Sequence, residues 1–210
     1  MSDREQSAGA IPRLILASGS SARHAILKNA SIAFTVIPAD IDEDAVRNSL
    51  LATDQQIDPA DLAEMLAQAK GSVVSTNNVG SLVIAADQIL VCGDEVFTKP
   101  ADQNAARETL MKLRGKTHQL HSAVVLARDG EIIWSHVETA NLAMRKFTAT
   151  FIAEYMLRSG ADICESVGAY KLEGMGTQLF DRIEGDYFTI LGLPLMPLLA
   201  KLREMGALTT

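Results

Sequence analysis

Hydrophobic and polar positions follow one another along the chain in blocks that predict both strands and helices. Short apolar runs predict strands at 14–17, 31–38 and 81–91, and longer runs predict strands at 116–128 and 131–144. Apolar residues three or four positions apart predict helices at 23–29, 59–75, 102–113, 148–158 and 194–205. Asp58 and Asp102 stand at the start of two of these helices, where a carboxylate is a good N-cap.

The order of these elements predicts the class of fold. The two long strands meet at Asp129-Gly130, a pair typical of a hairpin turn. Because this hairpin interrupts the alternation of strands and helices, we expect an α/β fold with a mixed sheet and helices on both sides. We also expect two lobes around a central cleft, since ligands usually bind in such clefts.

Residues 14–27, LILASGSSARHAIL, are the most informative stretch of this pattern. A predicted strand ends at Ala17, a polar turn covers 18–21, and Arg23 lies in the first turn of the predicted helix. Such a turn directs backbone N–H groups at one point, and an arginine beside it suits a phosphate group. The alternative is that Ser18, Ser20 or Ser21 only caps the helix.

Composition narrows the range of partners. The 210 residues are 48% hydrophobic and 21% charged, as in an ordinary globular protein, and residues 1–12 are expected to be a disordered tail. The net charge is −7 and no Lys/Arg cluster is present, which argues against a nucleic-acid polymer as partner. No apolar run approaches 18 residues, so no membrane partner is expected. Two cysteines without a CxxC pattern, and no secretory signal, predict a cytoplasmic location.

Two charged residues stand out within or beside apolar segments. Asp87 interrupts the apolar strand at 81–91, and a buried carboxylate costs several kcal/mol unless it is paired, hydrogen-bonded or bound to metal. It is therefore a candidate functional residue, or else a carboxylate that bonds to a nearby loop. Lys99 precedes Pro100 at the entrance of a predicted helix, where it either binds phosphate or is solvated.

The segment at 39–45 is predicted to be an acidic loop, with carboxylates at Asp40, Asp42, Glu43 and Asp44. By itself such a loop is a solvated turn. Beside a polyphosphate it becomes a candidate Mg²⁺ or Mn²⁺ site, because hard cations take carboxylate oxygens.

Seven segments in order make the chain similar to the Maf-type nucleoside triphosphate pyrophosphatases. They are LILASGSSARHAIL (14–27), VIPADIDE (36–43), LAQAK (66–70), VIAADQILV (83–91), EVFTKPAD (95–102), LMKLRGKTHQLHSAV (110–124) and VGAYKLEGMGTQLFDRIEGDYFTILGLPL (167–195). The resemblance implies an elongated Maf/ITPase-like fold of two lobes over 13–210, which is often a homodimer. It also implies hydrolysis of a nucleoside triphosphate between its α- and β-phosphates, and a link to arrest of cell division.

Carried over by position, the resemblance also implies roles for individual residues. Asp87 matches the catalytic carboxylate of the family, which is proposed to act as general base. Glu43, with Asp42 beside it, matches the acidic residue near a divalent cation, Mg²⁺ or Mn²⁺. The polar residues that bind phosphate in the family correspond to Ser18, Arg23, Lys70 and Lys99.

The chain departs from the family pattern at positions that bear on the base. Where the family commonly has SPRR, this chain has Ser21-Ala22-Arg23-His24. Gln88 and Glu173 replace the threonine and the glutamine of the subgroup that cleaves dTTP and UTP, so the chain is more similar to the 7-methyl-GTP subgroup. The Glu173 carboxylate could accept both N–H donors of a guanine edge. However, Ala22 stands where that subgroup has a tryptophan.

Two other function classes remain open at this point. The LILASGSSAR start is similar to the LAGGxSxRMG loop of nucleotidyltransferases, which would require a second substrate, although the second glycine and the Met-Gly are missing. A non-catalytic nucleotide sensor acting on the division machinery is the other alternative, and it would bind nucleotide without turnover.

Overall fold

A computed structural model describes residues 12–53 and 57–209, so the predicted disordered tail lies outside the described residues apart from Pro12. The strands are β1 (Leu14–Leu16), β2 (Thr35–Val36), β3 (Leu82–Cys92), β4 (Glu95–Phe97), β5 (Thr117–Arg128), β6 (Glu131–Met144) and β7 (Phe180–Glu184). The helices are α1 (Ser21–Asn29), α2 (Glu43–Thr53), α3 (Pro59–Thr76), α4 (Gln103–Leu113), α5 (Ala149–Ser159), α6 (Tyr187–Ile190) and α7 (Leu195–Glu204), with 3-10 turns η1 (Gly160–Glu165) and η2 (Met175–Leu179).

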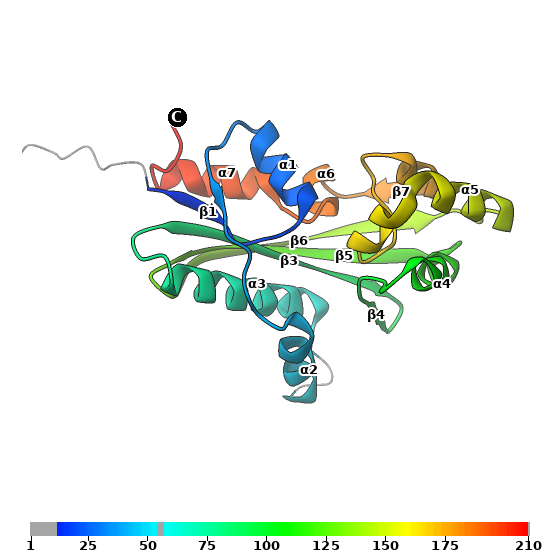
Figure 1. Ribbon diagram of the computed structural model, residues 1–210, viewed down its shortest axis with the longest axis horizontal. Helices are drawn as coiled ribbons and strands as arrows, with labels where there is room; N and C mark the ends of the chain where they lie inside the picture. Colours follow the sequence, from blue (N-terminus) through cyan, green and yellow to red (C-terminus); the bar gives the residue numbers. More distant parts are fainter. Residues whose placement is uncertain (1–11, 54–56, 210) are drawn as a thin grey trace, which may run out of the picture.

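The described strands form one mixed sheet in the order β2-β1-β3-β5-β6-β7, with β4 paired to the end of β3. β1 runs parallel to β2 and β3, whereas β3, β5, β6 and β7 pair antiparallel. The long β5–β6 hairpin extends along the molecule, and helices lie above and below the sheet in Figure 1. The predicted α/β class, elongated mixed sheet and hairpin are therefore confirmed.

Strand β3 shows why the sheet is buried on both faces. Its side chains alternate, as they must in a strand. Leu82, Ile84 and Ala86 belong to the apolar cluster between the sheet and helices α1 and α7. Val83 and Ala85 belong to the cluster on the opposite face, between the sheet and α3. A third apolar cluster, at the far end of the sheet, packs α4 and α5 against β5 and β6. Asp87 thus lies in the middle strand, near the point where these clusters meet.

The first difference from the sequence-based expectation lies between residues 31 and 53. The strand predicted at 31–38 is reduced to β2, because the chain leaves α1 through Ser31 at φ 56° and a bond from Ile32 N to Leu27 O. The loop predicted at 39–45 is found only as far as Asp42, and helix α2 begins at Glu43. The apolar cluster that contains the buried residues of α3 is also contacted by Val46, Leu50 and Leu51 of α2. The helical spacing of these three residues is the pattern that the prediction of a loop did not take into account.

Two short strands were also missed, β4 and β7. Each is defined by pairing with the edge of a longer strand, and so has little pattern of its own. None of the helices within 12–53 and 57–209 has the length and apolarity needed to cross a membrane.

Candidate active site

A single cavity of about 880 Å³ brings the predicted site residues together. Its volume falls within the range of small-molecule sites, about 300–1,000 Å³. The candidate residues that line it include Ser18, Ala22, Arg23, Asp42, Glu43, Lys70, Asp87, Gln88, Lys99 and Glu173. Asp40 of the predicted acidic loop is not part of the lining. The lining candidates come from the β1–α1 turn, α1, the start of α2 and the residue before it, α3, β3, the segment after β4 and the loop before η2, so the fold assembles one site from distant segments.

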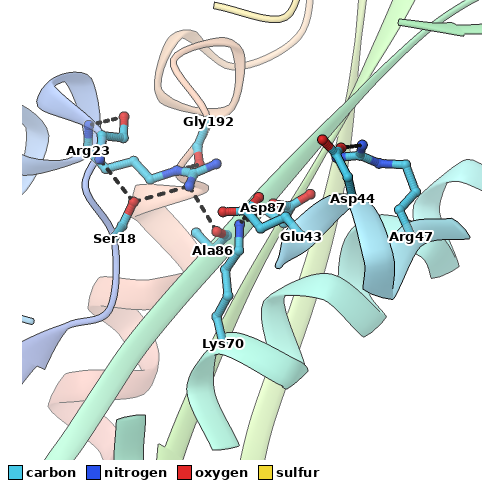
Figure 2. A network of polar contacts seen from close by, with 10 residues as sticks. Ser18, Arg23, Glu43, Asp44, Arg47, Lys70, Ala86, Asp87 and Gly192 are labelled. Atoms are coloured by element: carbon cyan, nitrogen blue, oxygen red, sulfur yellow. Dashed lines mark hydrogen bonds and ion pairs between the residues drawn. The ribbon is translucent and has the colours of Figure 1, made fainter. Parts of the chain in front are cut away.

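At the centre of the cavity, Lys70 joins two carboxylates, as Figure 2 shows. Its Nζ lies 2.5 Å from Asp87 Oδ1 and 2.7 Å from Glu43 Oε2. Lys70 and Asp87 are each only 5% exposed, so both charges depend on one another for compensation. We call Lys70, Asp87 and Glu43 the ion triad.

The local fold explains how the ion triad forms. Lys70 lies on the buried face of α3, one turn after Leu66, and next to Gly71. A Cβ at position 71 would lie 3.1 Å from a Val125 methyl group, so a glycine there lets α3 approach the sheet closely. Burial alone would raise the pKa of Glu43, but Lys70, with smaller contributions from Lys99 and Arg23, holds it below its ordinary value.

The turn after β1 has the geometry expected of a helix start. The Ser20 hydroxyl accepts from Arg23 N, which makes Ser20 the N-cap of α1, and Ser18 Oγ accepts from Ser20 N at 3.2 Å. The helix cap considered for this turn is therefore present, and Ser20 provides it. It does not conflict with an anion site, because the first N–H groups of a helix still point out of its end.

The guanidinium of Arg23 donates several hydrogen bonds within the protein, which the sequence did not predict. Its Nε donates to Gly192 O at 2.7 Å, and Nη1 donates to Ala86 O at 2.8 Å and to Ser18 Oγ at 3.3 Å. Burial lowers the pKa of Arg23, while the charges of Asp87 and Glu43 oppose that effect. Arg23 therefore ties α1 to β3 and to the segment after α6, besides presenting positive charge to the cavity (Figure 2).

Hydrogen bonds from its amide nitrogen hold the Gln88 side chain in place. Nε2 lies within hydrogen-bond distance of Ser122 Oγ (2.8 Å), Ile190 O (3.1 Å) and Thr189 O (3.2 Å). These acceptors determine which end of the amide is the donor, so Oε1 is left as an acceptor. Gln88 therefore anchors the end of α6 at the cavity.

The remaining candidates lie at the edge of the cavity. Lys99 and Glu173 are exposed, Ala22 is half-buried, and Asp42 Oδ1 accepts from Ala45 N at 2.9 Å, which caps the start of α2. One oxygen of Asp42 is thus already engaged.

The charges that line the cavity do not favour an anion by themselves. Six carboxylates and five cationic side chains line it: Asp42, Glu43, Asp44, Asp87, Glu165 and Glu173, against Arg23, Arg47, Lys70, Lys99 and Lys171. A polyphosphate would therefore need additional positive charge. Among the described residues no group of three or more His, Cys, Asp or Glu side chains could hold a metal ion. The Glu43 and Asp87 oxygens nevertheless converge on one ammonium group, so a divalent cation fits here if substrate phosphates supply further oxygens.

The structure adds lining residues that the sequence analysis did not single out. Arg47 lies one turn into α2, and Lys171 pairs with Glu165 at 3.0 Å. Tyr170 is buried and shares a 2.7 Å hydrogen bond with His118 Nε2. Arg47 lies four residues after Glu43, a spacing that puts both side chains on the same face of a helix. This spacing could have indicated Arg47 from the sequence only if helix α2 had been predicted.

Comparisons with known proteins agree with this architecture. Residues 13–205 match the family described as Maf-like protein. A "7-methyl-GTP pyrophosphatase" from Brucella abortus is 54% identical over 192 residues, which cover 91% of this chain and 96% of that protein. A protein of the same name from Mesorhizobium japonicum is 51% identical over 93% of this chain and 98% of its own. A "Nucleoside triphosphate pyrophosphatase" from Paramagnetospirillum magneticum is 52% identical over 92% and 99%, respectively. The chain therefore belongs to the Maf family.

Proposed function

We propose that this protein is a nucleoside triphosphate pyrophosphatase that acts on a guanine-type nucleotide such as 7-methyl-GTP. The observation that carries the proposal is the convergence of sequence candidates from distant segments on one cavity, whose lining includes the buried carboxylate of Asp87. The names of the relatives from Brucella and Mesorhizobium support the same activity. The cavity would be the cleft between the two lobes predicted for residues 13–210.

The ion triad suggests how the reaction proceeds. A water molecule attacks the α-phosphorus, the bond from that phosphorus to the α–β bridging oxygen breaks, and nucleoside monophosphate and pyrophosphate are formed. Asp87 takes the proton of the water as general base. Its Oδ1 contacts Lys70, so Oδ2 is the oxygen that would accept the proton of the water. Lys70 keeps the carboxylate in one position, since side chains this deeply buried cannot easily reorient.

Other groups of the cavity lining would hold the phosphate chain. The start of α1 and Ser18 offer hydrogen-bond donors, and Lys99 offers a charge at the edge of the cavity. Glu43 and Asp87 would hold a divalent cation, which neutralises charge on the phosphates when bound.

Base selection is proposed to depend on two acceptors. Gln88 Oε1 is left free by the three acceptors around Nε2, and the Glu173 carboxylate is exposed on the lining of the same cavity. Guanine presents adjacent N–H donors on one edge, whereas uracil and thymine present one donor between acceptors, which carboxylate oxygens would repel. The positive charge of a methylated guanine adds to its attraction for Glu173.

The test is pyrophosphate release from 7-methyl-GTP, GTP, dTTP and UTP with Mg²⁺ or Mn²⁺. Asp87→Asn is expected to lower turnover by at least about 100-fold, the contribution typical of a general base. Asp94→Asn is the matched control, because Asp94 lies exposed in the turn after β3 and away from the cavity lining. Glu173→Gln is expected to reduce the preference for 7-methyl-GTP over UTP.

The outcomes separate the competing functions. Binding without turnover on any nucleotide would favour the sensor, and pyrophosphate release only with an added acceptor would favour a nucleotidyltransferase. Fastest cleavage of dTTP and UTP would overturn the role of Glu173 but not the hydrolase. The homodimer and the cytoplasmic location remain predictions, and sedimentation of the purified chain tests the first.

A further inference from the structure

Arg47 is a cation of the cavity that the proposed mechanism does not yet use. It lies on α2 and lines the same cavity as the ion triad. Its side chain is only 15% exposed, and its Nη1 contacts Asp44 Oδ1 at 2.5 Å. Its Nε is buried without a hydrogen-bond partner among the described residues. An arginine so placed retains donors for a further ligand.

The partner of Arg47 holds it weakly. Asp44 is 79% exposed and stands three residues before Arg47 on the same helix. Because Asp44 is mostly solvated, water screens this pair, and an ion pair within one helical turn contributes little. A phosphate group could therefore take the guanidinium from Asp44 at small cost.

The other cations of the cavity are more fully engaged. Lys70 is shared between Asp87 and Glu43, and Lys171 pairs with both Glu165 and Asp162. Arg23 donates to two backbone carbonyls and a hydroxyl. Within the described residues, Arg47 and Lys99 are thus the cavity cations most available to an anion.

Figure 2 shows where Arg47 would act. Asp44 and Arg47 lie on the other side of Asp87 and Glu43 from Ser18 and Arg23. The helix that carries Arg23, α1, also carries Ala22, the position at which the 7-methyl-GTP subgroup has a tryptophan and which bears on the base. A nucleotide with its α-phosphorus at Asp87 would therefore extend its terminal phosphates toward α2.

We propose that Arg47 binds the terminal phosphates of the nucleotide and the pyrophosphate that leaves. This inference rests on the proposed function, since it assumes a triphosphate in the cavity. The planar guanidinium can contact two phosphate oxygens at once, and charge accumulates on those oxygens as the α–β bond breaks. Arg47 would then contribute to both binding and turnover.

The experiment measures binding of inorganic pyrophosphate and of nucleoside monophosphate by calorimetry, together with KM and kcat for the preferred triphosphate. Arg47→Gln removes the charge but keeps a residue that favours helix, and Arg47→Lys restores the charge without the planar fork. The control is Arg158→Gln, because Arg158 also pairs with a carboxylate of its own helix, Glu154 at 2.6 Å on α5, but is exposed and outside the cavity lining.

Arg47→Gln is expected to weaken pyrophosphate binding by about tenfold or more, as for loss of a hydrogen bond to a charged group. Binding of monophosphate should stay unchanged, Arg47→Lys should lie between, and Arg158→Gln should match the wild type. Equal pyrophosphate binding in Arg47→Gln and the wild type would overturn the proposal. Equal weakening of monophosphate and pyrophosphate would overturn the assignment to the terminal phosphates.

The two proposals can fail separately. A wild type that binds pyrophosphate but hydrolyses no nucleotide would reject the proposed function, while the comparison of Arg47 variants would still decide the role of Arg47. Turnover that is unaffected by Arg47→Gln would leave the proposed function and reject this inference. A wild type that binds neither pyrophosphate nor triphosphate would reject both.

Discussion

Replacing Lys70 by methionine is the most direct test of how the site is held together. Methionine keeps much of the apolar length of lysine and removes the charge. The change leaves Asp87, which is 5% exposed in the middle of β3, without its counter-ion 2.5 Å away. Glu43 loses the same partner but is half-exposed and can be solvated. The expected effect is therefore dominated by Asp87.

The magnitude follows from the geometry of that pair. At a separation of 2.5 Å and an effective dielectric constant of about 20, the gross attraction is about 6 to 7 kcal/mol. Part of it offsets the desolvation of both groups, and removal of one partner from a buried pair costs about 3–5 kcal/mol of stability. The Glu43 contact adds little, because water screens that side chain.

Urea unfolding followed by circular dichroism measures this loss. With a slope near 2–3 kcal/mol per molar urea, the midpoint of Lys70→Met should fall by about 1–2 M. Asp87→Asn in the Lys70→Met background should recover most of the loss, because the unpaired charge is then gone. Lys112→Met, which breaks the exposed pair with Glu95, should leave the midpoint nearly unchanged. Equal midpoints for Lys70→Met and Lys112→Met would refute the argument.

Three further predictions concern the loop that carries Glu173, the effect of pH on stability, and the effect of removing metal. Gly176→Ala would place a Cβ 2.3 Å from Lys171 O and should raise KM for the nucleotide several-fold by displacing this loop, whereas Gly174→Ala, with 4.0 Å to the same atom, should not. Burial lowers the pKa of His118 to about 4, so between pH 6.5 and 4 the unfolded state binds more protons and stability should fall as the pH falls. The loss is at most about 3 kcal/mol, and His118→Gln should flatten the measured profile, whereas an unchanged slope would contradict this assignment. Chelation with EDTA should abolish turnover without lowering Tm, since Lys70 already compensates Glu43 and Asp87; a large drop in Tm would indicate a structural metal.

The sequence by itself determined the features that depend on residues close together in the chain. Asp58 accepts from Ala60 N at the start of α3, and Asp129-Gly130 turns the long hairpin, both as predicted. The strand, polar turn and helix at 14–29 were also recognisable, because caps and period need only a few neighbouring residues. The same locality made Asp87 conspicuous, as a charge within an apolar run.

The tertiary structure alone decided which of these residues act together. Lys70 and Asp87 are 17 positions apart, and Gln88 is 101 positions from the Thr189 carbonyl that helps to fix its amide. Neither distance follows from a local pattern, because both depend on how α3 and α6 pack on the sheet. Helix α2 begins at Glu43, within the predicted acidic loop, since its apolar residues pack on the cluster formed with α3, and only that packing carried Arg47 to the cavity. Local propensity thus selects the elements, and burial of apolar faces selects their partners.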